Sequence, residues 1–428
     1  MRILSITAGA AQMYCGSCLR DNALAAELLS RGHDVTLLPF YTPTLTDEKN
    51  VSRQARVFFG GISVYLEQHL APFRHTPQWL HRVLDAPGVI SAFTKKSIAV
   101  APKALGALTV STLRGEAGHQ RREIDQLVTW VTSEPPPELV NIPYTLLIAL
   151  AAPLRRALRC PVVVTLQGED LFLEGLPQPY KDEALNLIRA QVADVDLFIA
   201  VSHYYADFMR DYLNIPASKL RVVPLGISLR DVPEAAPLRR DPFTVGYFAR
   251  VAPEKGLHVL AQAYRILRQD LGVPHARLRA GGYLPPEQKS YLHTIERRLD
   301  ASGLHGELEY IGAVDRQAKF AFLRTMDVLS VPSPYREPKG LYALEAMACG
   351  VPVVQPAHGA FPEILRRTGG GLLADSDSPA DIAARLHEIY RDPDLGRELG
   401  RRGHAGVREH YDIRHMADAV LKVYRELL

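Results

Sequence analysis

The stretch from Arg336 to Val354, REPKGLYALEAMACGVPVV, limits the possible folds of this chain more than any other segment. An apolar strand signal precedes it. Leu341 to Cys349 favours a helix that Gly350 would end, and Val351 to Val354 favours another buried strand. The order strand, loop, helix, strand is typical of a parallel α/β sheet. In such a unit the loop and the helix N-terminus form a natural anion site, because the unpaired backbone amides and the helix dipole point toward the ligand.

Two glutamates lie in this stretch with seven residues between them, Glu337 in the loop and Glu345 inside the helix. A carboxylate accepts several hydrogen bonds, so it can bind both hydroxyls of a vicinal diol. Two carboxylates beside an anion site suit a ligand that has both phosphates and hydroxyls. The pattern therefore favours a sugar nucleotide.

Length and composition restrict the class of protein further. With 428 residues the chain is too long for one ordinary core, so we expect two domains. The net charge of +3 gives no broad basic footprint, and nucleic acid is not an expected partner. The N-terminus begins directly in a strand signal, MRILSIT, and the longest apolar run, Ile142 to Leu154, is too short to span a bilayer. These features predict a cytoplasmic protein without a signal peptide.

The chain starts with a βαβ pattern: a strand over Met1–Thr7, a helix over Leu19–Arg31 and a strand over His33–Phe40. The loop before the helix does not have the glycine spacing of a dinucleotide-binding motif, so a nicotinamide or flavin cofactor is not expected. Gly16 in this loop could let the backbone approach a phosphate, or it could be a plain turn glycine.

Cys15 and Cys18 have the spacing of a redox pair or of half a zinc site. Since the chain offers no second pair, a zinc site is not expected. A redox pair at the start of a helix stays open, because a helix N-terminus stabilises thiolates. Small buried residues that pack a tight loop are the favoured interpretation.

Residues 58 to 122 mix aromatic side chains with helical-looking runs, and the region of about 58–125 suggests an irregular insertion. Between residues 71 and 125, eight Lys and Arg stand against four Asp and Glu. This excess of positive charge could bind an acidic or membrane-bound acceptor. The favoured alternative is a solvated helical face.

Polar residues follow the predicted strand Val162–Leu166, namely Gln167, Glu169 and Asp170. Open α/β sheets bind their ligands at this end of the strands. After a polar, proline-containing linker from Ile227 to Pro242, a second series of strands begins.

Arg250 and Lys255 flank a turn before a helix in this second series. Two cations at a helix N-terminus form a strong diphosphate site, although alone they would more often be solvated surface charges. Downstream, Gly359 lies in a turn that leads into a further helix.

The Asp-x-Asp pairs at 194–196 and 375–377 resemble metal sites, but we expect loop polarity at both, because the cation pair makes a metal unnecessary.

From about residue 201 to its end, the chain resembles the retaining family 4 glycosyltransferases of the GT-B fold, and it does so more loosely over residues 1–50 and 138–200. The matching pieces are Gly16, Val223-Pro224-Leu225-Gly226, Arg250 and Lys255 with Gly256, Glu337 to Glu345 with LEAMACGVPVV, and Gly359 to Glu363. The resemblance implies an α/β architecture of two Rossmann-like parallel-sheet domains that face a central cleft. The acceptor-side domain would span residues 1–228 with the insertion at about 58–125, and the donor-side domain residues 229–408. A terminal helix, 409–428, could cross back to the first domain.

The resemblance also implies roles for single residues. Arg250 and Lys255 would bind the diphosphate, and Glu345 would bind the ribose hydroxyls. Glu337 would lie beside the hydroxyls of the transferred sugar. The remaining expected contacts are backbone amides and polar groups around the donor and the acceptor: Gly16, Gly340 and Leu341 on the donor, and Gln167, Asp170 and Gly359 on the sugar or acceptor side.

Three positions depart from the family pattern. Gln167 stands where a histidine is common; its amide can bind a hydroxyl but cannot titrate. Cys15 and Ala360 each stand where a glycine is usual. The departures concern the sugar and acceptor side more than the nucleotide side.

The resemblance implies a retaining transferase, and the cation pair predicts that it needs no metal and no cofactor. Its donor would be a UDP-, GDP- or ADP-sugar and its acceptor a carbohydrate, a lipid-linked molecule or a small molecule. Peripheral contact with the inner membrane face, through about residues 71–125, is left open. So are three alternatives: a catalytically silent sugar-nucleotide binding protein, a GT-B sugar-nucleotide epimerase, and a redox protein that uses Cys15 and Cys18.

Overall fold

A computed structural model describes residues 1–9, 15–52, 102–235, 241–375 and 378–428. The chain forms two compact units, one of residues 1–224 and 416–428 and the other of residues 225–415. Each unit is described by itself below. Among the described residues, none of the helices has the length and apolar character needed to cross a bilayer.

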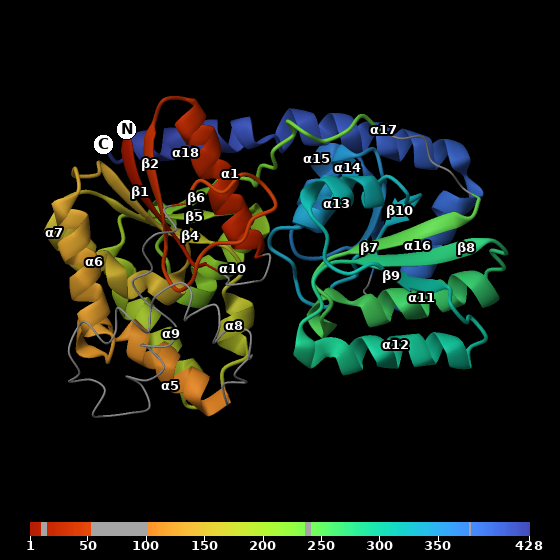
Figure 1. Ribbon diagram of the computed structural model, residues 1–428, viewed down its shortest axis with the longest axis horizontal. Helices are drawn as coiled ribbons and strands as arrows, with labels where there is room; N and C mark the ends of the chain where they lie inside the picture. Colours follow the sequence, from red (N-terminus) through yellow and green to blue (C-terminus); the bar gives the residue numbers. More distant parts are fainter. Residues whose placement is uncertain (10–14, 53–101, 236–240, 376–377) are drawn as a thin grey trace. The chain divides into compact units, whose positions relative to one another are not determined.

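The first unit contains a six-stranded parallel sheet in the order β2-β1-β3-β4-β5-β6 (Figure 1). Its strands are β1 (Arg2–Thr7), β2 (Asp34–Pro39), β3 (Leu139–Ile142), β4 (Val162–Leu166), β5 (Leu197–Ala200) and β6 (Leu220–Val222). Every residue of β3, β4 and β5 is buried. Parallel strands with helices on both faces are buried on both sides, which explains their unbroken apolar sequences.

The helices of the first unit connect these parallel strands. They are α1 (Gly16–Ser30), α5 (Pro102–Leu113), α6 (Arg121–Ser133), α7 (Ala151–Leu158), α8 (Asp170–Glu174), α9 (Tyr180–Gln191) and α10 (His203–Leu213), with short 3₁₀ turns at Gly115–Ala117, Thr145–Leu150, Val192–Asp194 and Ala217–Lys219. Helix α1 begins at Gly16, three residues before the predicted start, with Cys15 as its N-cap.

The predicted irregular insertion over about 58–125 is helical where the structure describes it. Helix α5 and the start of α6 account for most of residues 102–125, and residues 58–101 lie outside the described part. The sequence of α5, PKALGALTVSTL, has apolar or small residues all around the helix, so it shows no amphipathic period. It packs against α9 and the turn at Thr145–Leu150. Of the positively charged residues in 71–125, Arg114 pairs with Glu183 at 2.5 Å. Membrane contact through this region stays a prediction.

The second unit repeats the design, with a parallel sheet in the order β12-β11-β10-β7-β8-β9. Its strands are β7 (Phe243–Phe248), β8 (Ala276–Gly281), β9 (Leu308–Tyr310), β10 (Val328–Leu329), β11 (Val353–Pro356) and β12 (Gly371–Ala374). Its helices are α11 (Leu257–Gln269), α12 (Lys289–Ala301), α13 (Arg316–Leu323), α14 (Leu341–Ala348), α15 (Phe361–Thr368), α16 (Pro379–Arg391) and α17 (Pro393–His410), with 3₁₀ turns at Pro253–Lys255 and Pro286–Gln288. Figure 1 shows α11 and α12 on one side of β7 and β8, and α13, α14 and α15 on the other.

The last helix, α18 (Ile413–Arg425), starts in the second unit and continues into the first, which includes the chain from Met416 onward. Asp418 accepts from Arg31 at 2.5 Å, and Glu426 accepts from Arg221 at 2.8 Å. Tyr424 is 2% exposed. The amphipathic tail that the sequence predicted thus packs in the first unit. The predicted terminal helix, 409–428, corresponds to the end of α17 and to α18.

Candidate functional site

The loop between β10 and α14 carries the first predicted glutamate and leads into the helix that carries the second. Gly340 is the N-cap of α14 and has φ +67°, a left-handed conformation that favours glycine. Helix α14 then begins at Leu341, whose amide is one of those left unpaired at a helix N-terminus. Upstream in the loop, the Ser333 hydroxyl donates to the Glu254 carbonyl at 2.6 Å. This bond ties the loop to the segment that precedes α11.

Glu337 and Lys255 form a buried ion pair in which Nζ donates to Oε2. The Glu337 side chain is 4% exposed and the Lys255 side chain 17%. The Lys255 ammonium also lies 5.9 Å from the ring centroids of Tyr335 and Tyr342, within the range of cation–π attraction. The backbone amide of Lys339 donates to Glu337 Oε1 at 3.3 Å. One cation, one carboxylate and two aromatic rings thus meet beside the N-terminus of α14.

The electrostatic balance at Glu337 keeps it ionised. Burial alone would raise the pKa of this carboxyl, but the charge and hydrogen bond of Lys255, with the charge and amide of Lys339, bring it below its ordinary value of 4.5. Burial raises the pKa of the nearby Tyr342 hydroxyl well above 10.0. That hydroxyl is buried and, among the described residues, has no hydrogen-bond partner.

The lowered pKa of Glu337 predicts a specific pH dependence of stability. Since the unfolded state binds its proton more tightly, the ionised carboxylate stabilises the native state above its ordinary pKa of 4.5, and this contribution is lost as the pH falls through the native pKa. Between about pH 6 and about pH 3 we expect the free energy of unfolding to fall more steeply for the wild type than for Glu337→Gln. Urea unfolding at several pH values measures both slopes. Equal slopes would contradict the assignment, because all other titrating groups are common to the two proteins.

Gly256 brings Lys255 to this loop. It is the N-cap of α11 with φ +74°, and a Cβ built on it would lie 1.9 Å from the Pro332 carbonyl oxygen. The backbone before α11 therefore runs against the loop after β10 at a distance that only glycine permits. Lys255 precedes this glycine, so its side chain starts close to Glu337.

Arg250, the other predicted diphosphate ligand, follows β7 and is 44% exposed in its side chain. Its guanidinium pairs with Glu254, the residue whose carbonyl accepts from Ser333. Within this unit, a single residue, Glu254, therefore links Arg250 to the loop that carries Glu337. The pair is exposed and contributes little to stability, so a phosphate could compete for the guanidinium.

Gly359 supports Glu337 from its other side. With φ +62°, a Cβ at this position would lie 2.6 Å from the Glu337 carbonyl oxygen. The amide of the next residue, Ala360, donates to that same oxygen at 2.8 Å. Ala360 has φ −81°, a conformation that any residue adopts, so the departure from the family's usual glycine causes no strain.

Glu345 lies in the second turn of α14 with its side chain 13% exposed. Lys319 of α13 donates to Glu345 Oε1 at 2.6 Å, and its own side chain is only 6% exposed. The sequence did not identify this lysine, or the two tyrosines beside Lys255. Nothing in the local pattern of α13 marks Lys319, because buried and exposed lysines look alike in sequence.

The predicted residues of the first unit are held by protein groups. The Gln167 amide nitrogen donates to the Pro143 carbonyl at 3.0 Å and to Asp21 Oδ1 at 3.2 Å, and Gln167 is 3% exposed. The Asp170 carboxylate accepts from the Tyr205 hydroxyl at 2.7 Å. Gly16 begins α1 and is half-buried. The roles of Gln167 and Asp170 on the sugar or acceptor side, and of Gly16 on the donor, stay predictions.

Cys15 and Cys18 are not joined in a disulfide, and Cys18 is fully buried. Its hydrogen bond with Cys15 and its burial both raise the pKa of the Cys18 thiol. A protonated thiol is a poor nucleophile, so the environment does not favour the redox hypothesis.

Asp194 and Asp196 precede β5, at the end of the strand opposite to the ligand-binding edge. Asp196 accepts from the Val162 amide and from Arg155, both at 2.8 Å, and so has a structural role. In the other pair, Asp377 lies outside the described residues. Within the described ranges, no three His, Cys, Asp or Glu side chains form a group that could hold a metal ion.

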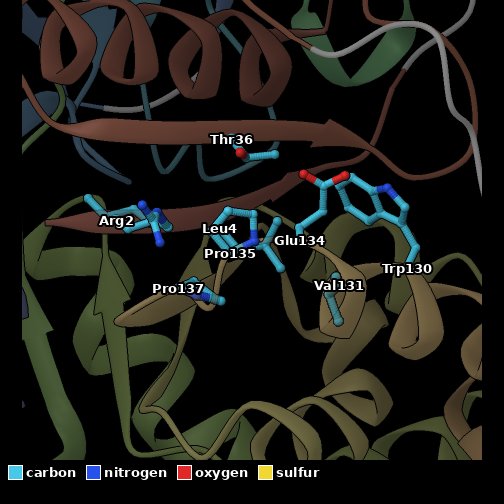
Figure 2. A pocket seen from close by; sticks show the side chains of 9 residues that line it. Arg2, Leu4, Thr36, Trp130, Val131, Glu134, Pro135 and Pro137 are labelled. Carbon is cyan, nitrogen blue, oxygen red and sulfur yellow. The ribbon is translucent and has the colours of Figure 1, made fainter.

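Figure 2 shows a small pocket in the first unit, between the amino-terminal parts of β1 and β2 and the end of α6. Its lining residues are Arg2, Ile3, Leu4, Thr36, Trp130, Val131, Glu134, Pro135 and Pro137. Open α/β sheets bind ligands beyond the carboxyl ends of their strands, so this pocket lies at the wrong end of the sheet for a substrate.

Two family models match consecutive parts of the chain: the model for glycosyl transferases group 1 matches residues 230–405, and the model for glycosyltransferase family 4 matches residues 113–231. Similar curated proteins are named D-inositol 3-phosphate glycosyltransferases. The one from Segniliparus rotundus is 27% identical over 86% of this chain and 81% of its own length. The proteins from Paenarthrobacter aurescens and Streptomyces bingchenggensis are 28% and 33% identical over 61% and 41% of this chain. These two matches span 60% and 38% of those relatives' lengths.

Solved structures share the fold over the whole chain. HepE from Anabaena, in complex with UDP and glucose, has a TM-score of 0.70 at 17% identity, with 100% of both chains covered. Sucrose-phosphate synthase from Thermosynechococcus elongatus has a TM-score of 0.71 at 19% identity, with 100% of this chain and 98% of that one covered. These likenesses confirm the predicted two-domain α/β fold of GT-B type. Both family models match in order along residues 113–405, and the two parallel sheets and the Glu337 to Glu345 stretch at a helix N-terminus agree with them. The chain therefore belongs to the family 4, group 1 glycosyltransferases.

Proposed function

We propose that the protein is a retaining glycosyltransferase that moves a sugar from a nucleotide-diphosphate sugar to an acceptor hydroxyl without a metal ion. Family membership supports transfer, and the relatives named above carry glycosyltransferase names. One structure of HepE holds UDP and glucose, and another holds UDP-glucose. A UDP-, GDP- or ADP-sugar is therefore the proposed donor.

The observation that carries this proposal is the placement of Lys255. The Lys255 side chain is 17% exposed, and Glu337 and two tyrosine rings contact its ammonium. The ammonium lies beside the N-terminus of α14, and Lys255 itself comes immediately before the N-terminus of α11. Partial desolvation of a lysine lowers the stability of the fold, so stability alone does not explain its position. Beside two helix N-termini it is well suited to a diphosphate.

The chemistry follows from where charge develops. When the anomeric carbon–oxygen bond breaks, the bonding electrons leave with the diphosphate. Fixed cations stabilise that growing charge more in the transition state than in the bound donor. Lys255 and Arg250 are the proposed cations, assisted by the amides of Gly340 and Leu341. The Gly16 amide would bind the distal phosphate.

The acceptor oxygen attacks the face from which the diphosphate departs, which retains the anomeric configuration. Its proton passes to the leaving phosphate oxygen, so no protein base or nucleophile is needed. Glu337 would accept hydrogen bonds from the sugar hydroxyls and Glu345 from the ribose. Gln167, Asp170 and Gly359 are proposed for the sugar or acceptor side. The acceptor is a carbohydrate, a lipid-linked molecule or a small molecule.

A second candidate, a silent sugar-nucleotide binding protein, is favoured by one observation. The Gln167 amide nitrogen is directed to Asp21 and Pro143 inside the first unit, where the family commonly has a histidine. Calorimetry that shows donor binding without turnover across a broad acceptor panel would support this candidate.

Thermal-shift screening with UDP-, GDP- and ADP-sugars tests the proposal first, since a ligand that binds only the native state raises its melting temperature. With the donor that shifts it, Arg250→Ala and Glu345→Ala are each expected to remove most donor turnover, by about a hundredfold. Release of the nucleoside diphosphate measures both transfer and hydrolysis. Turnover at the wild-type rate in both variants would refute the proposal.

A further inference from the structure

Lys319 lies in α13, a helix whose first turn is anchored to the rest of the second unit. Arg316 holds Asp231 with two bonds, Nε to Oδ2 at 2.7 Å and Nη2 to Oδ1 at 2.9 Å, and also donates to the Ser228 carbonyl at 2.7 Å. Asp315 caps the helix by accepting from the Ala318 amide at 2.8 Å. Residues three apart on a helix share a face, so the anchor at Arg316 also fixes where Lys319 starts.

From this position the Lys319 ammonium reaches across to α14. It donates to Glu345 Oε1 at 2.6 Å, with side chains that are 6% and 13% exposed. Its Nζ also lies 5.3 Å from the centroid of the Phe320 ring, which covers it with apolar surface. Lys319 is thus more buried than Lys255, which is 17% exposed, whereas Glu345 is more exposed than Glu337, at 4%.

Such a pair contributes little to holding α13 against α14. The desolvation of two charges offsets most of their attraction, and well-packed apolar side chains would join the helices as well or better. What the ammonium does achieve is local: its hydrogen bond immobilises one oxygen of the Glu345 carboxylate. A glutamate has three rotatable side-chain bonds, and a tether removes that freedom before a ligand arrives.

We propose that Lys319 is a positioning residue for ribose recognition. It orients Glu345 through Oε1, so that Oε2 accepts hydrogen bonds from the ribose hydroxyls of the donor nucleotide. The inference rests on the proposed function, which assigns the ribose to Glu345. Lys319 itself does not touch the ligand.

Calorimetric titration of the full chain with UDP, GDP and ADP, and with their 2′-deoxy counterparts, tests this inference. For the nucleotide that binds, the wild type is expected to lose about tenfold in affinity when the 2′-hydroxyl is missing, as for a hydrogen bond to a charged group. Lys319→Met is expected to weaken the ribonucleotide by about tenfold and to reduce the preference for ribose to within about threefold. Lys319→Arg, which keeps the charge and the donor, should retain most of the preference.

Glu345→Gln should reproduce the result of Lys319→Met, and the double variant should be no weaker than either single one, because Lys319 acts only through Glu345. Arg268→Met is the matched control. It breaks a partly buried ion pair with Glu307 at 2.8 Å in the same unit, so it should lower the melting temperature without changing the preference for ribose. If Lys319→Met does not fold, Lys319→Leu replaces it, because leucine likewise removes the charge and the donor to Glu345.

Two results would overturn the inference in distinguishable ways. If Lys319→Met keeps the wild-type preference for ribose while Glu345→Gln loses it, Lys319 is only structural and the proposed function stands. If no ribonucleotide binds the wild type, or Glu345→Gln keeps the preference, the nucleotide site itself is misassigned and the inference fails with it.

Discussion

Replacement of Lys255 with methionine is expected to lower the turnover number for sugar transfer by about a hundredfold to a thousandfold, the usual effect of removing one preorganised group that stabilises a developing negative charge. The variant also leaves the 4% exposed Glu337 carboxylate without its cation, and that charge would repel the diphosphate. The effect should therefore appear in both donor affinity and turnover. Steady-state release of nucleoside diphosphate, with the donor selected by thermal shift, measures it.

Two controls separate chemistry from folding. Lys289→Met removes an exposed lysine at the start of α12 in the same unit and should leave turnover unchanged. Lys255→Met with Glu337→Gln removes both charges of the pair, so it should regain much of the stability that the single variant loses without regaining transfer. Turnover by Lys255→Met within about threefold of the wild type would contradict the assignment of this lysine to the leaving group.

Gly256→Ala is expected to destabilise the second unit by about 3 kcal/mol or more and to remove most transfer activity. An alanine at φ +74° bears the strain of the left-handed conformation, about 1–2 kcal/mol. Its Cβ would also lie 1.9 Å from the Pro332 carbonyl oxygen, so the loop that carries Glu337 must move away from Lys255. Thermal unfolding and transfer assays on the same preparation measure both effects.

Gly272→Ala provides a matched control, because Gly272 has φ +70° but, among the described residues, no atom within 4 Å of the added Cβ. It should show the conformational strain alone, about 1–2 kcal/mol, with normal transfer. If the two alanine variants lose the same stability and both remain active, the close approach of the backbone to Pro332 does not hold the site together.

Much of the fold could be predicted from the sequence because parallel strands are buried on both faces and therefore appear as continuous apolar runs. The run VVVTL became β4 at the predicted ends, and MRILSIT became β1, which is one residue shorter than predicted. The bounds of helix α5 could not be predicted, for the converse reason. Its surface is apolar or small on all sides, so no helical period distinguishes it from an irregular segment.

The candidate site was predictable to the extent that it is local. Glu337, Gly340, Leu341 and Glu345 lie on one loop and one helix, and their spacing alone places them around the N-terminus of α14. Gly359 was predicted as a turn glycine next to a ligand. In the structure, the backbone of Glu337 passes close to Gly359 because glycine has no side chain. No local sequence pattern encodes this contact.

By itself the sequence determined the order of strands and helices. It also determined that both glutamates lie around a helix N-terminus and that cations precede another helix. Each of these features depends on residues that are close together in the chain. The tertiary structure alone decided which charges pair. Lys255 meets Glu337 across 82 positions of sequence, and Lys319 meets Glu345 across 26. The first pairing arises because parallel strands bring their following loops to one edge of a sheet, and the second because α13 packs against α14. Burial then determines which side chains meet there, since a charge removed from water needs a partner of opposite sign.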